Sequence, residues 1–180
     1  MDHEEASDPA RPPAHLPDAS ITVPYPDFPM NEDPVPDTDA EKLGRFLTAQ
    51  VTVYEQALDE LRRGRKRTHW MWFVFPQLAG LGRSATAQFY AISDADEAKA
   101  YLRHPVLGPR LLEAADAILS APAGRSAREI LGDPDDMKLR SCATLFAAIS
   151  REDSIFHRLL DRFFGGKPDA RTLELLHLVQ

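Results

Sequence analysis

Apolar side chains recur at three- and four-residue steps through most of the chain from residue 39 onward, which is the spacing of one helix face. The first such stretch follows a capping box, Thr38-x-x-Glu41, and continues to Leu61, just before Gly64, which is placed to end the helix. The same spacing predicts further helices near 84–92, 93–103, 105–119, 126–131, 134–149, 155–164 and 173–178. No strand-like alternation and no Asn-Gly hairpin signal accompanies them. The pattern therefore predicts an all-α fold, a compact bundle of about seven or eight short helices in orthogonal or superhelical packing.

Cap residues mark several of the predicted helix starts. Ser84 and Ser93 precede two of them, Pro105 suits the first turn of the helix over 105–119, and Ser126-x-x-Glu129 is a second capping box. The apolar run 70–75 has no polar face and must be buried, although periodicity alone does not separate helix from strand there. Because its surroundings are helical, we expect a short helix that starts at 68.

Residues 1–38 differ from the rest in composition. They hold nine of the fifteen prolines, and residues 1–40 carry ten acidic residues against one basic residue, Arg11. Such a segment is too polar and too rich in proline to form a packed core, so we predict a disordered acidic leader (1–38) and one helical domain (39–180). Residues 41–180 hold eighteen acidic and twenty basic residues. The formal charge of −7 therefore comes from the leader and says nothing about what the folded body binds.

Several classes of protein do not fit this sequence. A single cysteine, Cys142, allows no intramolecular disulfide, which points to a reducing compartment, the cytoplasm. No apolar run approaches the roughly 20 residues of a membrane span, and the acidic start does not resemble a secretory signal. No His, Cys or carboxylate spacing matches a metal-binding motif, so we expect no metal and no cofactor.

The densest chemical signal lies at residues 62–77. Five cations fall within the six residues 62–67, and an aromatic run that begins with His69 and Trp70 follows at once. Guanidinium groups bind phosphate or carboxylate, and a helix that starts at Thr68 would add free N–H groups favourable to anions. The functional interpretation is an anion or nucleotide pocket floored by aromatic rings. The structural interpretation, which we weigh slightly higher, is that the cations cap a helix end and the aromatic residues form core.

A second stretch, 133–144, also combines charge with hydroxyl groups. Lys138 and Ser141 share one helix face with Asp135 at three-residue steps, an arrangement that can bind an oxyanion. A solvated face with pairs inside the helix explains the same pattern and is favoured. Cys142 lies among apolar neighbours, so we interpret it as packing rather than as a nucleophile.

Three runs together resemble a known family. They are GRKRTHWMWFVFPQLAGLGRS at 64–84, AYLRHPVLGPRL at 100–111 and DDMKLRS at 135–141. They closely resemble the bacterial domain-of-unknown-function 1810 family, whose members are sometimes mislabelled calpastatin-like, over about residues 42–178. The resemblance implies a compact all-helical domain and no established activity, cofactor or catalytic residue. Calpastatin-type inhibitors are repetitive disordered chains, whereas this sequence predicts capped, amphipathic helices. The calpastatin label therefore has no support.

We expect a domain that binds an anionic small molecule such as a nucleotide derivative. The same hypothesis allows that the domain also processes this molecule chemically. In this hypothesis Arg65, Lys66 and Arg67 neutralise charge, and His69 donates a proton or a hydrogen bond, which makes it the candidate catalytic residue. Either tryptophan supplies a stacking face. The full candidate set is Arg65, Lys66, Arg67, His69, Trp70, Trp72, Gln77, Arg83, Ser84, Tyr101, His104, Lys138 and Arg140.

The alternative is a protein-interaction module without chemistry, whose groove accepts a helix or an extended segment. In that case the acidic leader competes for a basic patch on its own body. Nucleic-acid binding is the weakest of the three hypotheses, because the body carries one local basic cluster and no known reading motif. The sequence alone gives neither the ligand, nor the presence of catalysis, nor the oligomeric state, nor the role of the leader.

Overall fold

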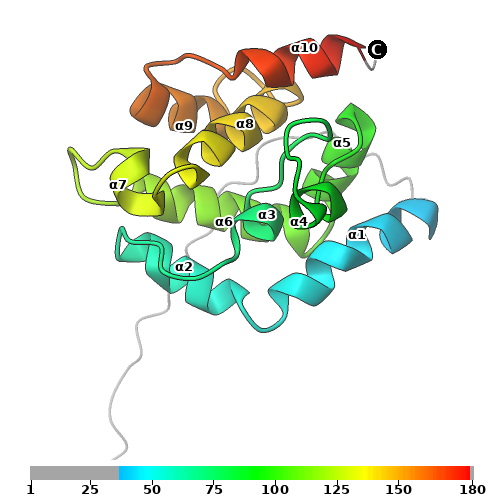
Figure 1. Cartoon of the computed structure of the whole chain (residues 1–180), viewed down its shortest axis with the longest axis horizontal. Coiled ribbons are helices and arrows are strands. Elements are labelled where there is room, and N and C mark those ends of the chain that lie inside the picture. Colours follow the sequence, from blue (N-terminus) through cyan, green and yellow to red (C-terminus); the bar gives the residue numbers. More distant parts are fainter. Residues whose placement is uncertain (1–36, 179–180) are drawn as a thin grey trace, which may run out of the picture. The chain divides into compact units, whose positions relative to one another are not determined.

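A computed structural model describes residues 37–178 of the chain, and the side chains of residues 41–177. This part contains ten helices and no strand beyond one isolated parallel bridge between Leu78 and Ile92, which confirms the predicted all-α class (Figure 1). The predicted leader lies outside the described residues except for its last two positions, which belong to the first helix. The helices are α1 (Asp37–Gln50), α2 (Tyr54–Arg62), α3 (Met71–Val74), α4 (Ala85–Phe89), α5 (Ala95–Arg103), α6 (Leu107–Leu119), α7 (Ala127–Leu131), α8 (Asp135–Ala148), α9 (Ile155–Phe164) and α10 (Ala170–Leu178).

The first predicted helix is divided in two. It was expected to run unbroken to Gly64, but α1 ends at Gln50 and α2 begins at Tyr54. Residues 51–53 (Val-Thr-Val) are all β-branched and lower the preference for a helix there. The buried Gln50 donates from Nε2 to the Phe73 carbonyl oxygen at 2.6 Å, which attaches the end of α1 to the α3 segment. This break is one reason for ten helices instead of the predicted seven or eight.

Two predicted caps are confirmed and two are shifted, while Thr38 lies inside α1 instead of before it. Ser126 and Glu129 form the expected capping box of α7, and the Ser84 hydroxyl accepts from the Ala87 N–H at the start of α4. The cap of α5 is Asp94 rather than Ser93, because the Asp94 carboxylate accepts two backbone N–H groups of the first turn. The proline at 105 precedes α6 instead of lying in its first turn, since α6 begins two residues later.

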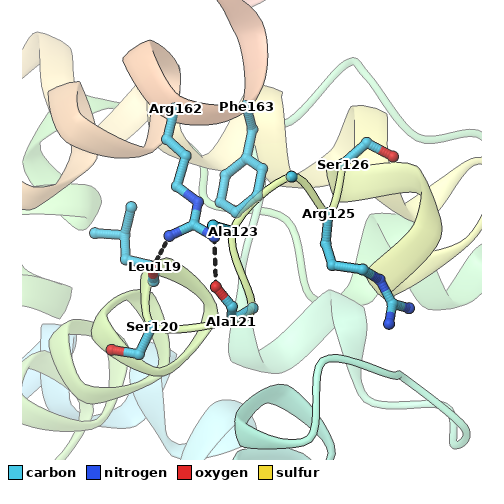
Figure 2. Close-up of a pocket in the computed structure, with 9 residues that line it drawn as sticks. Leu119, Ser120, Ala121, Ala123, Arg125, Ser126, Arg162 and Phe163 are labelled. Atoms are coloured by element: carbon cyan, nitrogen blue, oxygen red, sulfur yellow. Dashed lines mark hydrogen bonds between the residues drawn. The ribbon is translucent and has the colours of Figure 1, made fainter.

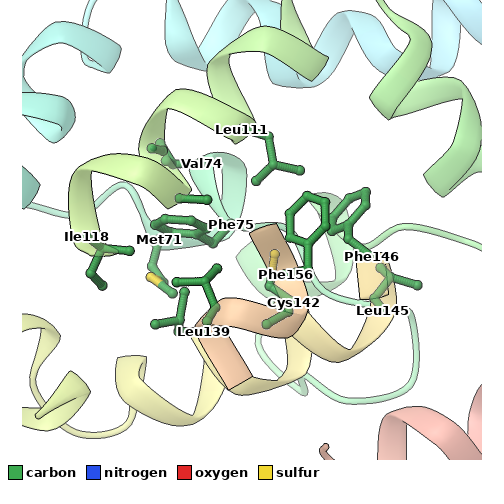
Figure 3. Packing of buried hydrophobic residues seen from close by; sticks show 14 of the residues in the cluster. Met71, Val74, Phe75, Leu111, Ile118, Leu139, Cys142, Leu145, Phe146 and Phe156 are labelled. Carbon is green, nitrogen blue, oxygen red and sulfur yellow. The ribbon is translucent and has the colours of Figure 1, made fainter. Parts of the chain in front are cut away.

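The core forms where α3, α6, α8 and α9 meet. Helix α6 lies between α2 and the paired helices α8 and α9 (Figure 1). Figure 3 shows side chains from these elements in contact, namely Met71, Val74 and Phe75, then Leu111 and Ile118, then Leu139, Cys142, Leu145 and Phe146, and finally Phe156. Cys142 is buried in this cluster, which confirms its predicted packing role, and burial raises the pKa of its thiol. Within the described residues, no helix is both long and apolar enough to cross a membrane.

The joint between α5 and α6 is unusually close. A Cβ added to Gly108 would lie 2.0 Å from the Leu102 carbonyl oxygen, so only glycine fits there. At the same joint, His104 Nδ1 accepts hydrogen bonds from the backbone N–H groups of Val106 at 3.1 Å and Leu107 at 3.3 Å. The imidazole therefore caps the start of α6.

Candidate functional site

The basic segment, residues 62–67 with the turn up to Trp70, already encloses an anion of its own chain. The Glu60 carboxylate accepts from the N–H groups of Arg67 at 2.8 Å and Thr68 at 3.1 Å. It also accepts from the Thr68 hydroxyl at 2.7 Å and from Trp70 Nε1 at 2.8 Å. Burial alone would raise the pKa of Glu60, but these hydrogen bonds outweigh it and lower the pKa to about 2. Glu60 is therefore a buried carboxylate, bound by neutral donors, around which the segment folds.

This arrangement corrects the prediction of an anion site at a helix start. Thr68 does not begin a helix, since α3 starts at Met71, and the Thr68 N–H is bound to Glu60 instead of facing a ligand. Trp70 is fully buried and its indole N–H is also bound to Glu60, so its ring belongs to the core. Trp72 is half-buried and is the tryptophan of the predicted pair that reaches the surface.

The second predicted stretch meets the first at Asp135. The carboxylate of Asp135 accepts from Lys66 Nζ on one oxygen and from Lys138 Nζ on the other, each at 2.8 Å. We call Lys66 and Lys138 the lysine pair. Burial would raise the pKa of Asp135, but the hydrogen bonds from Lys138 and Lys66 prevail and lower it. Two candidate regions that are far apart in sequence are thus one cluster in space.

The lysine pair is enclosed by aromatic rings. Lys66 Nζ lies 5.2 Å from the ring centroid of Trp70, and Lys138 Nζ lies 4.6 Å from that of Trp72, both within cation–π range. The exposed fractions of the side chains are 9% for Lys66, 15% for Asp135 and 19% for Lys138. The three charges sum to +1, because two ammonium groups share one carboxylate. A positive charge in excess is therefore held largely out of solvent.

The other cations predicted for this segment lie on its outer surface. Arg65, Arg67 and His69 are all exposed. In the part of the chain that the structure describes, Arg65 and Arg67 form no ion pair. The backbone N–H of Lys66 donates to the Ile130 carbonyl oxygen at 2.7 Å, which holds the segment against α7. The segment thus turns one lysine inward and leaves the arginines in solvent.

Three candidates expected to close the site from other helices serve local structure instead. Tyr101 is fully buried, and its hydroxyl accepts from Gln50 Nε2 at 3.2 Å. His104 caps α6 as described above, and burial lowers its pKa. Arg140 donates to the carbonyl oxygens of Lys167 at 2.9 Å and Pro168 at 3.0 Å, which attaches the loop before α10 to α8.

The candidates on the loop after α3 also have local roles. The carbonyl oxygen of the half-buried Gln77 accepts from the Ile92 N–H at 2.8 Å, and Ser84 caps α4. Arg83 is exposed. Among the thirteen predicted residues, the structure therefore gathers Lys66, Trp70, Trp72 and Lys138 around one carboxylate.

Two hollows lie away from this cluster, beside α9. The larger has a volume of about 540 Å³ and lies between the end of α6, the 120–126 loop and α9 (Figure 2). Arg162 crosses it and donates to the carbonyl oxygens of Leu119 and Ala121, whereas the guanidinium of Arg125 points away. The second hollow, of about 460 Å³, shares Leu119 and Arg162 and adds Arg158 and Asp161. No predicted site residue lines either hollow.

Sequence reasoning overlooked Glu60 and underrated Asp135. Glu60 lies on the apolar face of its helix, between Leu58 and Leu61, and a charge in that position was the signal available. Asp135 was grouped with Lys138 on one helix face, but nothing local indicates its bond to Lys66. Within the described residues, no group of three or more His, Cys, Asp or Glu side chains is placed to hold a metal ion.

The fold and this cluster define a small all-helical domain with a lysine pair beside one buried and one half-buried tryptophan. The chain belongs to the family described as Protein of unknown function (DUF1810), whose model matches residues 40–176. It is similar to the crystal structure of the conserved hypothetical protein Rv1873 from Mycobacterium tuberculosis, with 51% identity and a TM-score of 0.73. That match covers 76% of this chain and 96% of the other. No protein with a curated description matches, and neither of these two descriptions names an activity.

Proposed function

We propose that the chain binds an anionic small molecule, nucleotide-like or phosphate-bearing, at the lysine pair. One observation carries the proposal. Two ammonium groups from distant segments share the single carboxylate of Asp135 where no side chain of the three is more than 19% exposed. Burying a charge in excess is unfavourable, and a purely structural contact would be better served by one lysine and one carboxylate. An anion from solution neutralises the excess.

The surroundings of the lysine pair suit such a ligand. Each ammonium group has three N–H donors, and Asp135 accepts one from each. The half-buried ring of Trp72 offers an aromatic surface beside Lys138. Arg65 and Arg67 lie on the same segment and are exposed, so they favour the approach of an anion from solution. His69 is the neighbouring residue that can transfer a proton if the ligand is also processed.

The test is calorimetric titration with ATP, AMP and inorganic phosphate, with adenosine as the probe that lacks phosphate. Replacement of Lys138 by Met removes the charge but keeps a chain of similar length. We expect it to weaken phosphate binding by about tenfold or more. The matched control is Lys99→Met, because Lys99 also pairs with an aspartate three residues earlier, Asp96, at 3.0 Å. Equal affinity of the two variants, or no binding of any phosphate probe, contradicts the proposal.

The same titrations separate the other hypotheses. A non-catalytic protein-interaction module predicts that none of the small probes binds. Nucleic-acid binding predicts weak binding of AMP but tight binding of an oligonucleotide, with an affinity that falls steeply with salt concentration. We place the proposed binding in the cytoplasm, where the single thiol of Cys142 stays reduced.

A further inference from the structure

The Asp135 carboxylate makes the contacts that a bound phosphate would make. One oxygen accepts from Lys66 Nζ and the other from Lys138 Nζ, each at 2.8 Å, which is the length of a charge-assisted hydrogen bond. Two neighbouring oxygens of a phosphate group can bridge the same pair of ammonium groups. We infer that Asp135 occupies the position of the ligand's phosphate in the free protein, and that a phosphomonoester displaces it from the lysine pair. This inference rests on the proposed function.

A comparison with Glu60 indicates that Asp135 is exchangeable. Glu60 is buried, and three of its hydrogen bonds come from the rigid backbone and from the indole of Trp70. In the described part of the chain, Asp135 accepts its two hydrogen bonds from the flexible ends of the two lysine side chains. Its own side chain is 15% exposed and lies in the first turn of α8, and a change of its χ1 rotamer is the movement that displacement requires. Removal of Asp135 therefore disturbs little besides the lysine pair.

The charge balance selects the class of ligand. The lysine pair carries +2, and Asp135 reduces this to +1. A carboxylate ligand that replaces Asp135 restores the same +1 and gains no electrostatic energy from the exchange. A phosphomonoester carries about −1.5 to −2 at pH 7, so it brings the pair close to neutrality. The site as built therefore favours a terminal phosphate over a carboxylate.

The test measures AMP affinity by calorimetry for the full chain and for two aspartate variants. Asp135→Asn keeps the shape of the side chain and removes its negative charge, so the lysine pair no longer has a competitor. We expect AMP to bind about tenfold more tightly, as it does when a competing state is removed. Asp96→Asn is the matched control, because Asp96 also binds a lysine three residues later, and it should leave the affinity unchanged.

A second variant gives a readout that needs no nucleotide. Asp135→Ala leaves the lysine pair without a carboxylate, so added acetate should raise the melting temperature of this variant but not that of the wild type. The measurement is a circular dichroism melt at constant ionic strength, with chloride as the reference anion. If acetate does not change the melting temperature of Asp135→Ala, the inference fails, and this result holds even if Asp135→Asn does not fold.

The outcomes distinguish the inference from the proposed function. AMP binding that depends on Lys138 but is unchanged or weaker in Asp135→Asn shows that Asp135 orients the lysines, and only the inference fails. Absence of AMP binding in the wild type and in Asp135→Asn removes both. Tighter AMP binding in Asp135→Asn, together with stabilisation of Asp135→Ala by acetate, supports both.

Discussion

Replacement of Glu60 by Gln tests whether the basic segment is held by an internal charge. Glutamine has the size of glutamate, and with its amide turned it can still accept from Arg67, Thr68 and Trp70 through one oxygen. What is lost is the negative charge, together with the longer hydrogen bond from Gln56 Nε2 to Oε1 at 3.3 Å. The pKa of Glu60 falls from an ordinary 4.5 to about 2, a difference of about 2.5 units. At 1.36 kcal/mol per unit, the ionised form contributes about 3 kcal/mol to the free energy of unfolding.

The sign of this term fixes its pH dependence. Because the pKa is lower in the folded state, the contribution is fully present above the unfolded value near 4.5 and is lost as the pH falls toward 2. The measurement is urea unfolding of the wild type and Glu60→Gln, followed by tryptophan fluorescence at pH 7, 5 and 3. We expect the wild type to be about 3 kcal/mol more stable at pH 7 and the difference to shrink steadily below pH 5.

The difference in stability between the wild type and Glu60→Gln at each pH excludes the titration of all other carboxylates, because both proteins share them. Glu55→Gln is the control for the loss of one charge on the same helix, since Glu55 is exposed, and it should change stability by less than about 0.5 kcal/mol. A difference between wild type and Glu60→Gln that stays constant from pH 7 to pH 3 refutes the reasoning. So does a difference at pH 7 no larger than that of the control.

Two further predictions concern the joint between α5 and α6. Gly108→Ala forces a Cβ to within 2.0 Å of the Leu102 carbonyl oxygen, and we expect it to lower the free energy of chemical unfolding by about 3 kcal/mol. The control is Gly44→Ala, which has nothing within 4 Å of its Cβ and should instead stabilise α1 by about 0.5–1 kcal/mol. Equal changes in the free energy of unfolding for the two variants contradict the prediction. His104 accepts its two hydrogen bonds through a neutral Nδ1, and burial lowers its pKa, so the stability from this cap is fully present above the unfolded pKa near 6.5 and is lost as the pH falls. Between pH 7 and 5 the wild type should therefore lose more stability than His104→Asn. Stability that falls equally with pH in both proteins contradicts the prediction.

Local signals in the sequence predicted most of the helices. The capping box of Ser126 with Glu129 and the Ser84 cap of α4 depend on contacts within a few residues, and both were found where expected. The break between α1 and α2 was missed because the apolar spacing continues through it. It is stabilised by the side chain of Gln50, whose partner Phe73 lies 23 residues away, and periodicity carries no information about such a contact.

The candidate site shows the same limit at longer range. Composition indicated that residues 62–77 carry unusual charge, but not which cation turns inward. Lys66 and Arg67 are adjacent in sequence, yet one is enclosed with Asp135 and the other faces solvent. The docking of α8 against the segment decides between them, and that docking depends on the whole core. Conversely, Tyr101 and Arg140 looked suited to a ligand because of their residue type alone, and tertiary contacts occupy them.

The basic segment binds two carboxylates of the chain in different ways, Glu60 through neutral donors and Asp135 through an ion pair, and their variants should separate stability from binding. Glu60 is enclosed by backbone and indole donors, so its loss should lower the free energy of unfolding while the lysine pair keeps its affinity for phosphate. Among the described residues, the Asp135 carboxylate accepts hydrogen bonds from the two lysines alone, so its loss should raise phosphate affinity. If both variants lose stability alike and neither changes phosphate affinity, both carboxylates serve structure alone and the lysine pair is part of the core.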